Sequence, residues 1–152
     1  MGPTVAIRPA AVDDARAIAT LLDLGSLHPG AEDVTDVSGY AAVIADGSAQ
    51  SSAVLVAEVD GVVVGVVQIF VFRHLQHRGG LCAELESMHV HPMWRGHGIG
   101  GTLLEAAAER AASLGCYRLQ LTSNLVRPDA HRFYEAHGFT ASHRGFKRSL
   151  TT

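Results

Sequence analysis

The sequence predicts a single mixed α/β domain that spans residues 1–152. Two runs rich in β-branched residues, Ser52–Val59 and Val62–Phe72, flank Asp60-Gly61, and this pattern is typical of a β-hairpin. A third apolar run, Cys82–Val90, leads through a glycine-rich turn into a helical pattern over Gly100–Leu114. Antiparallel strands in the first half and a strand–helix–strand unit in the second half together indicate a mixed sheet.

The other expected elements follow from local signals along the chain. Val5–Pro9 is expected to form a short strand, and an amphipathic helix follows it, with Asp13 and Asp14 at its start and Gly25 at its end. The remaining predicted elements are a helix over Ser38–Ala45, a strand over Arg118–Thr122, a helix from Pro128 to His137, and short strand-like segments at Ala141-Ser142 and Phe146-Lys147.

Composition and charge exclude several classes of protein. The formal net charge is −3, and no dense basic run indicates a nucleic-acid partner. No apolar run reaches the about 18 residues that a membrane span needs, and the first residues carry no secretory signal pattern. The two cysteines, Cys82 and Cys116, have neither metal-site spacing nor a disulfide framework. We therefore expect a cytoplasmic protein with no membrane or nucleic-acid partner.

The glycines between Arg95 and Gly101 have a spacing that suits phosphate binding at a helix start. Residues 96–101, Gly-His-Gly-Ile-Gly-Gly, match the dinucleotide pattern G-x-G-x-x-G, but that fold needs an acid about 20 residues further on. The next predicted strand ends in Thr122-Ser123-Asn124, without an acid, and the lysine of a P-loop is also missing. The same residues also fit a third frame, R-x-x-G-x-G, which begins at Arg95.

In this third frame the chain resembles the GNAT superfamily of N-acetyltransferases. The segment from Met88 to Pro92 precedes the R-x-x-G-x-G turn, and residues 130–139 are similar to the superfamily's A-x-x-F-Y-x-x-x-G-F segment. Ile7–Ala10 also resembles a GNAT start, and the C-terminal half is most similar to aminoalkylphosphonate N-acetyltransferases. The resemblance implies a mostly antiparallel sheet of about six to seven strands with about four helices, in which two central strands splay to hold the cofactor.

The resemblance also implies an enzyme that moves an acetyl group from acetyl-CoA to a primary amine of a small molecule. The amine would attack directly, in a ternary complex of both substrates. Two alternatives stay open: acetylation of a protein lysine or N-terminus, and a non-catalytic sensor that binds acyl-CoA. Because dimers are common in the superfamily, a homodimer is also among the expected assemblies.

The resemblance assigns cofactor contacts to two segments and one side chain. The pyrophosphate would lie against backbone amides of the glycine turn, and the pantetheine arm along the preceding strand. A backbone amide of that strand would also polarise the thioester carbonyl. The implied cofactor-binding residues are Met88, His89, Val90, Arg95, Gly96, His97, Gly98, Ile99, Gly100, Gly101, Asn124 and Tyr134.

Acetyl transfer to an amine requires a base and a proton donor, since an ammonium group has a pKa of about 10. Glu86, acting directly or through water, is the expected base, and Glu84 shares its sheet face two residues away. By resemblance Tyr134 donates a proton to the coenzyme A thiolate. Its helical spacing from Ala130 and Phe133 is equally typical of a packing residue.

Four histidines, His74, His77, His89 and His91, are expected near one sheet edge. They lack the helical spacing of a metal motif, so no resident metal is predicted. A divalent ion that bridges a phosphonate substrate remains an alternative. Neither cysteine has an evident neighbouring base, so both are interpreted as apolar residues rather than nucleophiles.

Overall fold

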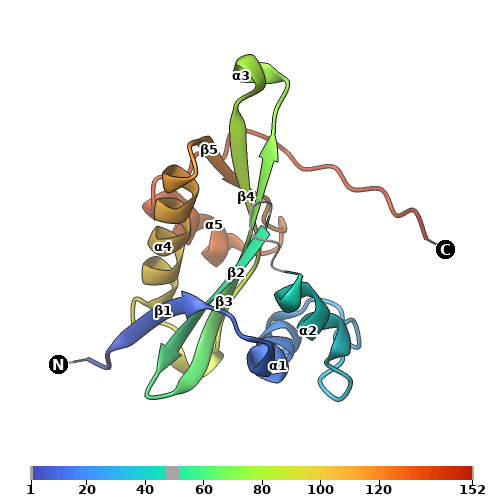
Figure 1. Cartoon of the computed structure of the whole chain (residues 1–152), viewed down its shortest axis with the longest axis vertical. Coiled ribbons are helices and arrows are strands. Elements are labelled where there is room, and N and C mark those ends of the chain that lie inside the picture. The colour runs from blue at the N-terminus through green and yellow to red at the C-terminus, as the bar shows by residue number, and fades with distance from the viewer. Residues whose placement is uncertain (1, 47–51, 152) are drawn as a thin grey trace.

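The computed structural model describes residues 2–46 and 52–151, and a five-stranded sheet forms its centre (Figure 1). The strand order β1-β2-β3-β4-β5 follows the sequence. The first four strands pair antiparallel, and β5 is parallel to β4. The strands are β1 (Val5–Pro9), β2 (Ser52–Val59), β3 (Val62–Arg73), β4 (Leu81–Val90) and β5 (Cys116–Leu121).

Helices cover both faces of this sheet. The α-helices are α1 (Ala15–Gly25), α2 (Ser38–Ala45), α3 (Gln76–Gly79), α4 (Ile99–Ser113) and α5 (Pro128–Ala136). The larger core cluster joins α4 and the inner side of α5 to one face, and a smaller cluster joins α1 and α2 to the other. Figure 1 shows these two pairs of helices on opposite sides of the strands. No helix within the described ranges is long and apolar enough to cross a membrane.

The β2–β3 hairpin turns at Asp60-Gly61, as predicted. Asp60 has a φ of 49° and Gly61 a φ of 79°. Two consecutive residues in the left-handed region are the requirement of the tight hairpin turn that Asp-Gly favours. The turn sets the register at Val59 opposite Val62, and an irregularity between Ala57 and Glu58 shifts it by one residue, so that the pairing ends at Ser52 opposite Phe70.

A β-bulge in β4 changes which side chains face which helices. Gln68 of β3 lies opposite Glu86, but Val66 lies opposite His89, so Val67 faces two residues of β4. Ser87, one of these two, has a φ of 53°. Leu85 and Met88 therefore both point into the α4 core, although they are three residues apart.

The pairing of β4 with β5 ends early. Leu85 opposite Leu121 is the last pair, whereas β4 continues to pair with β3 as far as Val90 opposite Gly65. Residues 86–90 consequently have no strand neighbour on the β5 side in the described part of the chain. This confirms the predicted splay of two central strands.

The predicted strand count was too high, because the C-terminal strand-like segments do not form. Ala141-Ser142 and Phe146-Lys147 lie in an extended tail without helix or strand. A strand needs a neighbour for its backbone groups, and the tail pairs with no strand within the described residues. The predicted polar connection after Phe72 is also shorter than expected, since β3 extends to Arg73 and the short α3 follows.

An ion-pair cluster joins β1, β2 and the start of α1. Arg8 donates from Nη1 and Nη2 to both carboxylate oxygens of Asp14, at 2.7 and 3.0 Å, and from Nε to Glu58 at 2.8 Å. Asp14 also accepts a hydrogen bond from the amide of Ala11 at 2.7 Å and is buried. The hydrogen bonds from Arg8 lower the pKa of Asp14.

We expect Asp14→Asn to lower the free energy of unfolding at neutral pH by about 1–3 kcal/mol, because it removes charge-assisted hydrogen bonds from a buried group. The pKa of Asp14 is lower in the folded than in the unfolded chain, so its stabilisation is complete above the ordinary aspartate pKa and is lost as the pH falls through the folded value. Denaturant titrations at a series of pH values from neutral into acid should show that the difference in free energy of unfolding between the wild type and the variant decreases.

Asp13→Asn is the matched control, since Asp13 lies next to Asp14 but is exposed. Its effect should stay within about 0.5 kcal/mol. Equal losses in the two variants would show that the ion pair does not stabilise this corner of the fold.

Candidate active site

The free edge of β4 and the glycine turn form one continuous backbone surface. Pro92–Trp94 makes a single helical turn after β4, and Gly96 and Gly98 follow with φ values of 81° and 78°. These left-handed conformations suit glycine, which has no Cβ. α4 then begins at Ile99, so the turn leads directly from the strand end to a helix N-terminus.

The amides of this turn are available to a ligand. Within the described residues, none of the amides from 96 to 101 donates to a protein acceptor. The carbonyl of Gly98, by contrast, accepts from both the amide and the hydroxyl of Thr102, each at 3.1 Å. Unpaired amides and the positive end of the α4 dipole together make an anion site.

Arg95 and His97 hold the turn in shape. Arg95 Nε donates to the carbonyl oxygen of Val90 at 3.2 Å. His97 Nδ1 lies 3.2 Å from the carbonyl oxygen of Trp94 and 3.0 Å from that of Arg95. Both side chains are exposed, so each can also approach a bound anion.

The last two glycines of the turn let α5 approach α4 closely. A Cβ on Gly100 would lie 3.3 Å from the ring of Phe133, and one on Gly101 would lie 2.8 Å from His137 Nε2. Gly96 and Gly98 thus shape the turn, whereas Gly100 and Gly101 make room for the neighbouring helix. This packing accounts for the extra glycine that completes the dinucleotide-like pattern.

Tyr134 is both a packing residue and a free phenol. Its ring packs edge-on against Phe133 and Phe139, with centroids 5.2 and 5.8 Å apart. Burial raises the pKa of Tyr134, and the positive charge of Arg127 partly opposes the rise. The hydroxyl is therefore protonated at neutral pH, and it makes no hydrogen bond with the described residues.

The two glutamates of β4 differ in their contacts. Glu84 is half-buried and accepts a hydrogen bond from Gln120 Nε2 at 3.0 Å. Glu86 is exposed and has no hydrogen-bonding or ionic partner in the described part of the chain. The glutamates lie on the sheet face opposite Leu85, while Tyr134 contacts the core on the α4 side. Glu86 and Tyr134 therefore lie on opposite faces of the sheet.

Sequence reasoning missed Arg127, which reaches from the start of α5 to the end of α1. Its Nη2 donates to the carbonyl oxygen of Gly25 at 2.6 Å. The ring of His89 lies against the same glycine, where a Cβ would be 2.1 Å from Nδ1. Burial lowers the pKa of His89, as do the nearby charges of Arg127 and Arg95, so the ring is neutral at pH 7.

Asn124 forms the turn after β5. Its Oδ1 accepts from the amide of Val126 at 3.0 Å, and its carbonyl oxygen accepts from the amide of Arg127 at 3.0 Å. The side-chain amide nitrogen has no partner among the described residues, so it is free to donate to a ligand.

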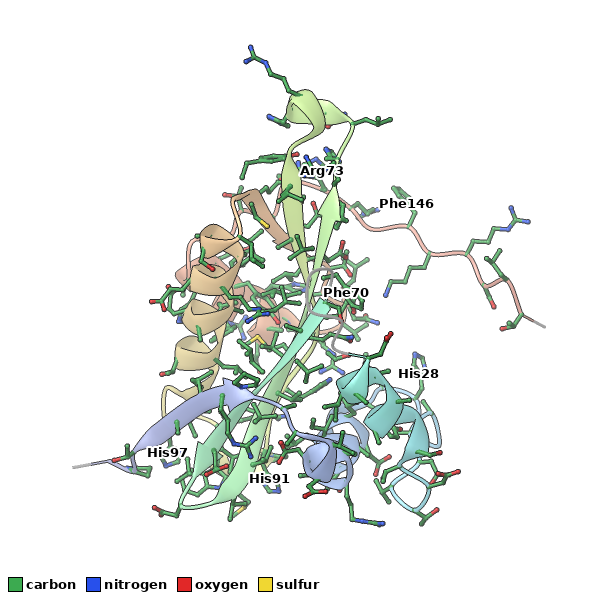
Figure 2. All side chains as sticks on the ribbon, in the orientation of Figure 1. His28, Phe70, Arg73, His91, His97 and Phe146 are labelled. Carbon is green, nitrogen blue, oxygen red and sulfur yellow. The ribbon has the colours of Figure 1, made fainter. Side chains whose placement is uncertain are left out.

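The four histidines do not cluster, and that prediction was wrong. His74 Nδ1 lies 3.1 Å from the hydroxyl of Tyr117, and the ring centroids of His77 and Tyr117 are 4.1 Å apart. Both histidines precede the first residue of β4. His89 and His91 lie at the other end of this ten-residue strand. Figure 2 shows Arg73, the neighbour of His74, and His91 at opposite ends of the sheet.

No group of three potential ligands within the described ranges is arranged to hold a metal ion. The cysteines are also poorly placed for nucleophilic chemistry. Cys82 is buried, and burial raises the pKa of the Cys116 thiol, which lowers its thiolate fraction.

Comparisons with known proteins agree with this geometry. Residues 23–139 match the acetyltransferase (GNAT) family. The chain is 37% identical over 91 residues to an aminoalkylphosphonate N-acetyltransferase of Salmonella typhimurium, covering 60% of this chain and 58% of that protein. It is 30% identical over 90 residues to a glucosamine 6-phosphate N-acetyltransferase of Trypanosoma brucei brucei, covering 59% of each. The chain thus spans less than two thirds of the length of either curated relative.

Among solved structures, a transcriptional regulator from Bacillus halodurans C-125 superposes with a TM-score of 0.90 at 33% identity, covering 97% of this chain and 100% of that chain. The family match extends over more than half of the sequence and includes β4, the glycine turn and α5. The chain therefore belongs to the acetyltransferase (GNAT) family.

Proposed function

We propose that this protein is an N-acetyltransferase that moves an acetyl group from acetyl-CoA to the primary amine of a small molecule. The observation that carries the proposal is the opening between β4 and β5, which a free strand edge and a row of unpaired amides border. Acetyl-CoA has a matching shape, since its pyrophosphate suits the amides and its pantetheine arm can pair with a strand edge.

In this proposal, the amides from 96 to 101 hold the pyrophosphate, and Arg95 and His97 add side-chain contacts. The edge at Met88, His89 and Val90 pairs with the pantetheine amides, together with the free side-chain nitrogen of Asn124. An amide of this edge also donates to the thioester carbonyl oxygen, and such donors contribute about 10²–10³-fold to rate.

The proposed reaction uses the two faces of the opening. Glu86 takes a proton from the ammonium group, directly or through water, and the neutral amine attacks the carbonyl carbon. The new C–N bond forms as the C–S bond breaks, and Tyr134 donates its hydroxyl proton to the leaving sulfur. The attacking nitrogen loses its second proton at this stage, and this proton returns through water to the Tyr134 phenolate. Glu84 is the weaker candidate for the base, because Gln120 already occupies its carboxylate.

We further propose that the acceptor amine carries an oxyanion such as a phosphonate or phosphate. The two curated relatives are named for amines of this kind. Arg127 supports the proposal, because its charge influences both His89 and Tyr134 and so lies close to the opening. In the described part of the chain no carboxylate forms a salt bridge with Arg127.

An amine panel with thiol release as the readout tests the acceptor. We expect kcat/KM for 2-aminoethylphosphonate to exceed that for ethanolamine by at least about tenfold, since a charged hydrogen bond is worth about 1.5–3 kcal/mol. Arg127→Gln should reduce this preference without loss of coenzyme A affinity. Equal rates for the two amines would contradict the oxyanion site, and turnover of peptides alone would point to a protein substrate.

Tyr134→Phe should lower kcat by at least about 10²-fold, the lower end of general acid catalysis, while the Kd for coenzyme A stays nearly constant. Phenylalanine keeps the packing against Phe133 and Phe139 and removes only the hydroxyl. Steady-state kinetics and calorimetry provide the two measurements. The control is Tyr117→Phe, which changes an exposed tyrosine beside the connection between β3 and β4. Unchanged kcat in Tyr134→Phe would remove its acid role.

Glu86→Gln should depress kcat/KM at neutral pH and shift the alkaline rise of the pH–rate profile towards the pKa of the free amine, about 10. The reason is that the variant depends on the small fraction of amine that is already neutral. Glu84→Gln is the matched control and should retain the wild-type profile. If instead only Glu84→Gln shifts the profile, Glu84 is the base; if neither does, water alone accepts the proton.

A further inference from the structure

The ring of His89 occupies the space that a missing side chain leaves at the end of α1. Gly25 is the last residue of this helix and is buried, and its φ is not positive, so its backbone conformation does not require glycine. Three ring atoms of His89, Nδ1, Cε1 and Cγ, lie within 3.1 Å of the place that a Cβ on residue 25 would occupy. Glycine is therefore needed here for the close approach of the imidazole, not for the end of the helix.

A second contact fixes the same residue of α1. Arg127 donates to the carbonyl oxygen of Gly25 at 2.6 Å. This bond joins the two helical layers, since Figure 1 shows α1 and α5 on opposite sides of the strands. The loop that follows α1, residues 26–37, is in turn tied to α2, because the hydroxyl of Tyr40 donates to Glu32 at 2.6 Å. The position of this loop thus depends on how the end of α1 is held.

The end of α1 borders the space beside the proposed base. His89 pairs with Val66 of β3, which packs in the α1 core cluster, and Glu86 pairs with Gln68, two residues further along β3. Residues two apart in a strand share a face, so His89 and Glu86 both lie on the face that α1 and α2 partly cover. An amine that reaches Glu86 on this face therefore lies near the end of α1.

We propose that His89 is a positioning residue for the acceptor amine. Its ring occupies the space at Gly25 and, together with Arg127, fixes the end of α1 and the loop after it relative to Glu86. The assignment rests on the proposed function, in which Glu86 is the base. Loss of the contact would let the loop move and would weaken acceptor binding. The glycine turn packs against α5, so the coenzyme A site is built from other contacts.

The neutral form of the ring suits this role, because charged groups surround it. Burial lowers the pKa of His89 most, the charges of Arg127 and Arg95 lower it further, and the carboxylate of Glu32 partly opposes them. The ring therefore becomes cationic only below the ordinary histidine pKa of about 6.5. A cation beside Arg127 would place like charges together in a half-buried contact. The contact with Gly25 is thus complete at neutral pH and is lost as the pH falls through the folded value.

Steady-state kinetics with 2-aminoethylphosphonate, or with the amine of the panel that reacts fastest, test the proposal. His89→Gln should raise KM for the amine at least about tenfold at neutral pH, since a misplaced substrate site is costly, while kcat and the Kd for coenzyme A change little. The KM ratio of variant to wild type should approach one as the pH falls through the folded pKa of His89. His28→Gln, which changes an exposed histidine in the loop after α1, is the control and should keep the wild-type KM.

Gly25→Ala tests the same contact from the side of α1. Its methyl group would overlap the ring of His89, so KM for the amine should rise in this variant as well. His89→Ala removes the ring and leaves room for the methyl group. The double variant Gly25→Ala/His89→Ala should therefore have a KM no higher than that of His89→Ala alone. Additive effects of the two substitutions would overturn the proposal.

Amide hydrogen exchange of residues 22–25 reports on the contact without acetyl transfer. After correction for the intrinsic effect of pH, these amides should lose protection in His89→Gln and, in the wild type, at acidic pH, while the amides of α4 stay protected. Unchanged exchange in His89→Gln overturns the proposal, and so does changed exchange with an unchanged KM. A wild type that releases no thiol with any amine contradicts the proposed function instead, and exchange then still decides whether His89 fixes α1.

Discussion

β4 loses its neighbour β5 after Leu85, and most of the candidate site follows from this early end of pairing. A strand that continues alone exposes backbone donors and acceptors that must be satisfied by water or by a ligand. The same divergence lets α5 pack against the first turn of α4, where Gly100 and Gly101 leave room for Phe133 and His137. That packing positions Tyr134, so the opening and its proposed proton donor have one structural origin.

The bulge at Ser87 determines what surrounds the opening. It lets Met88 and Val90 contribute to the α4 core, while His89 points to the other face and contacts the backbone of Gly25. Without the extra residue, the alternation of side chains along β4 would place His89 on the α4 side and Met88 and Val90 on the other face. An imidazole would then replace methionine in the core, and α1 would lose the flat surface on which its last turn rests.

Local patterns predicted the elements within one or two residues at most ends, because hairpin turns, prolines and glycines are short-range signals. They did not predict the bulge, since serine gives no indication of a positive φ. The predicted histidine cluster was wrong, because the ten-residue strand β4 separates His74 and His77 from His89 and His91. Arg127 was missed because its contact with Gly25 joins residues 102 positions apart. The predicted C-terminal strands were wrong, because an alternating sequence pattern indicates that a segment can form a strand but does not show which strand it would pair with.

Tyr134 illustrates how the site balances two requirements of the proposed proton donor. Burial raises the pKa of Tyr134, which keeps the phenol protonated at neutral pH, but too large a rise would make transfer to a thiolate unfavourable, because a thiol has a pKa of about 8.5. The charge of Arg127 opposes the rise. Since Arg127 is also bonded to Gly25, its distance from Tyr134 is tied to the position of α1. An acceptor that shifts α1 would therefore change the acidity of Tyr134 as well.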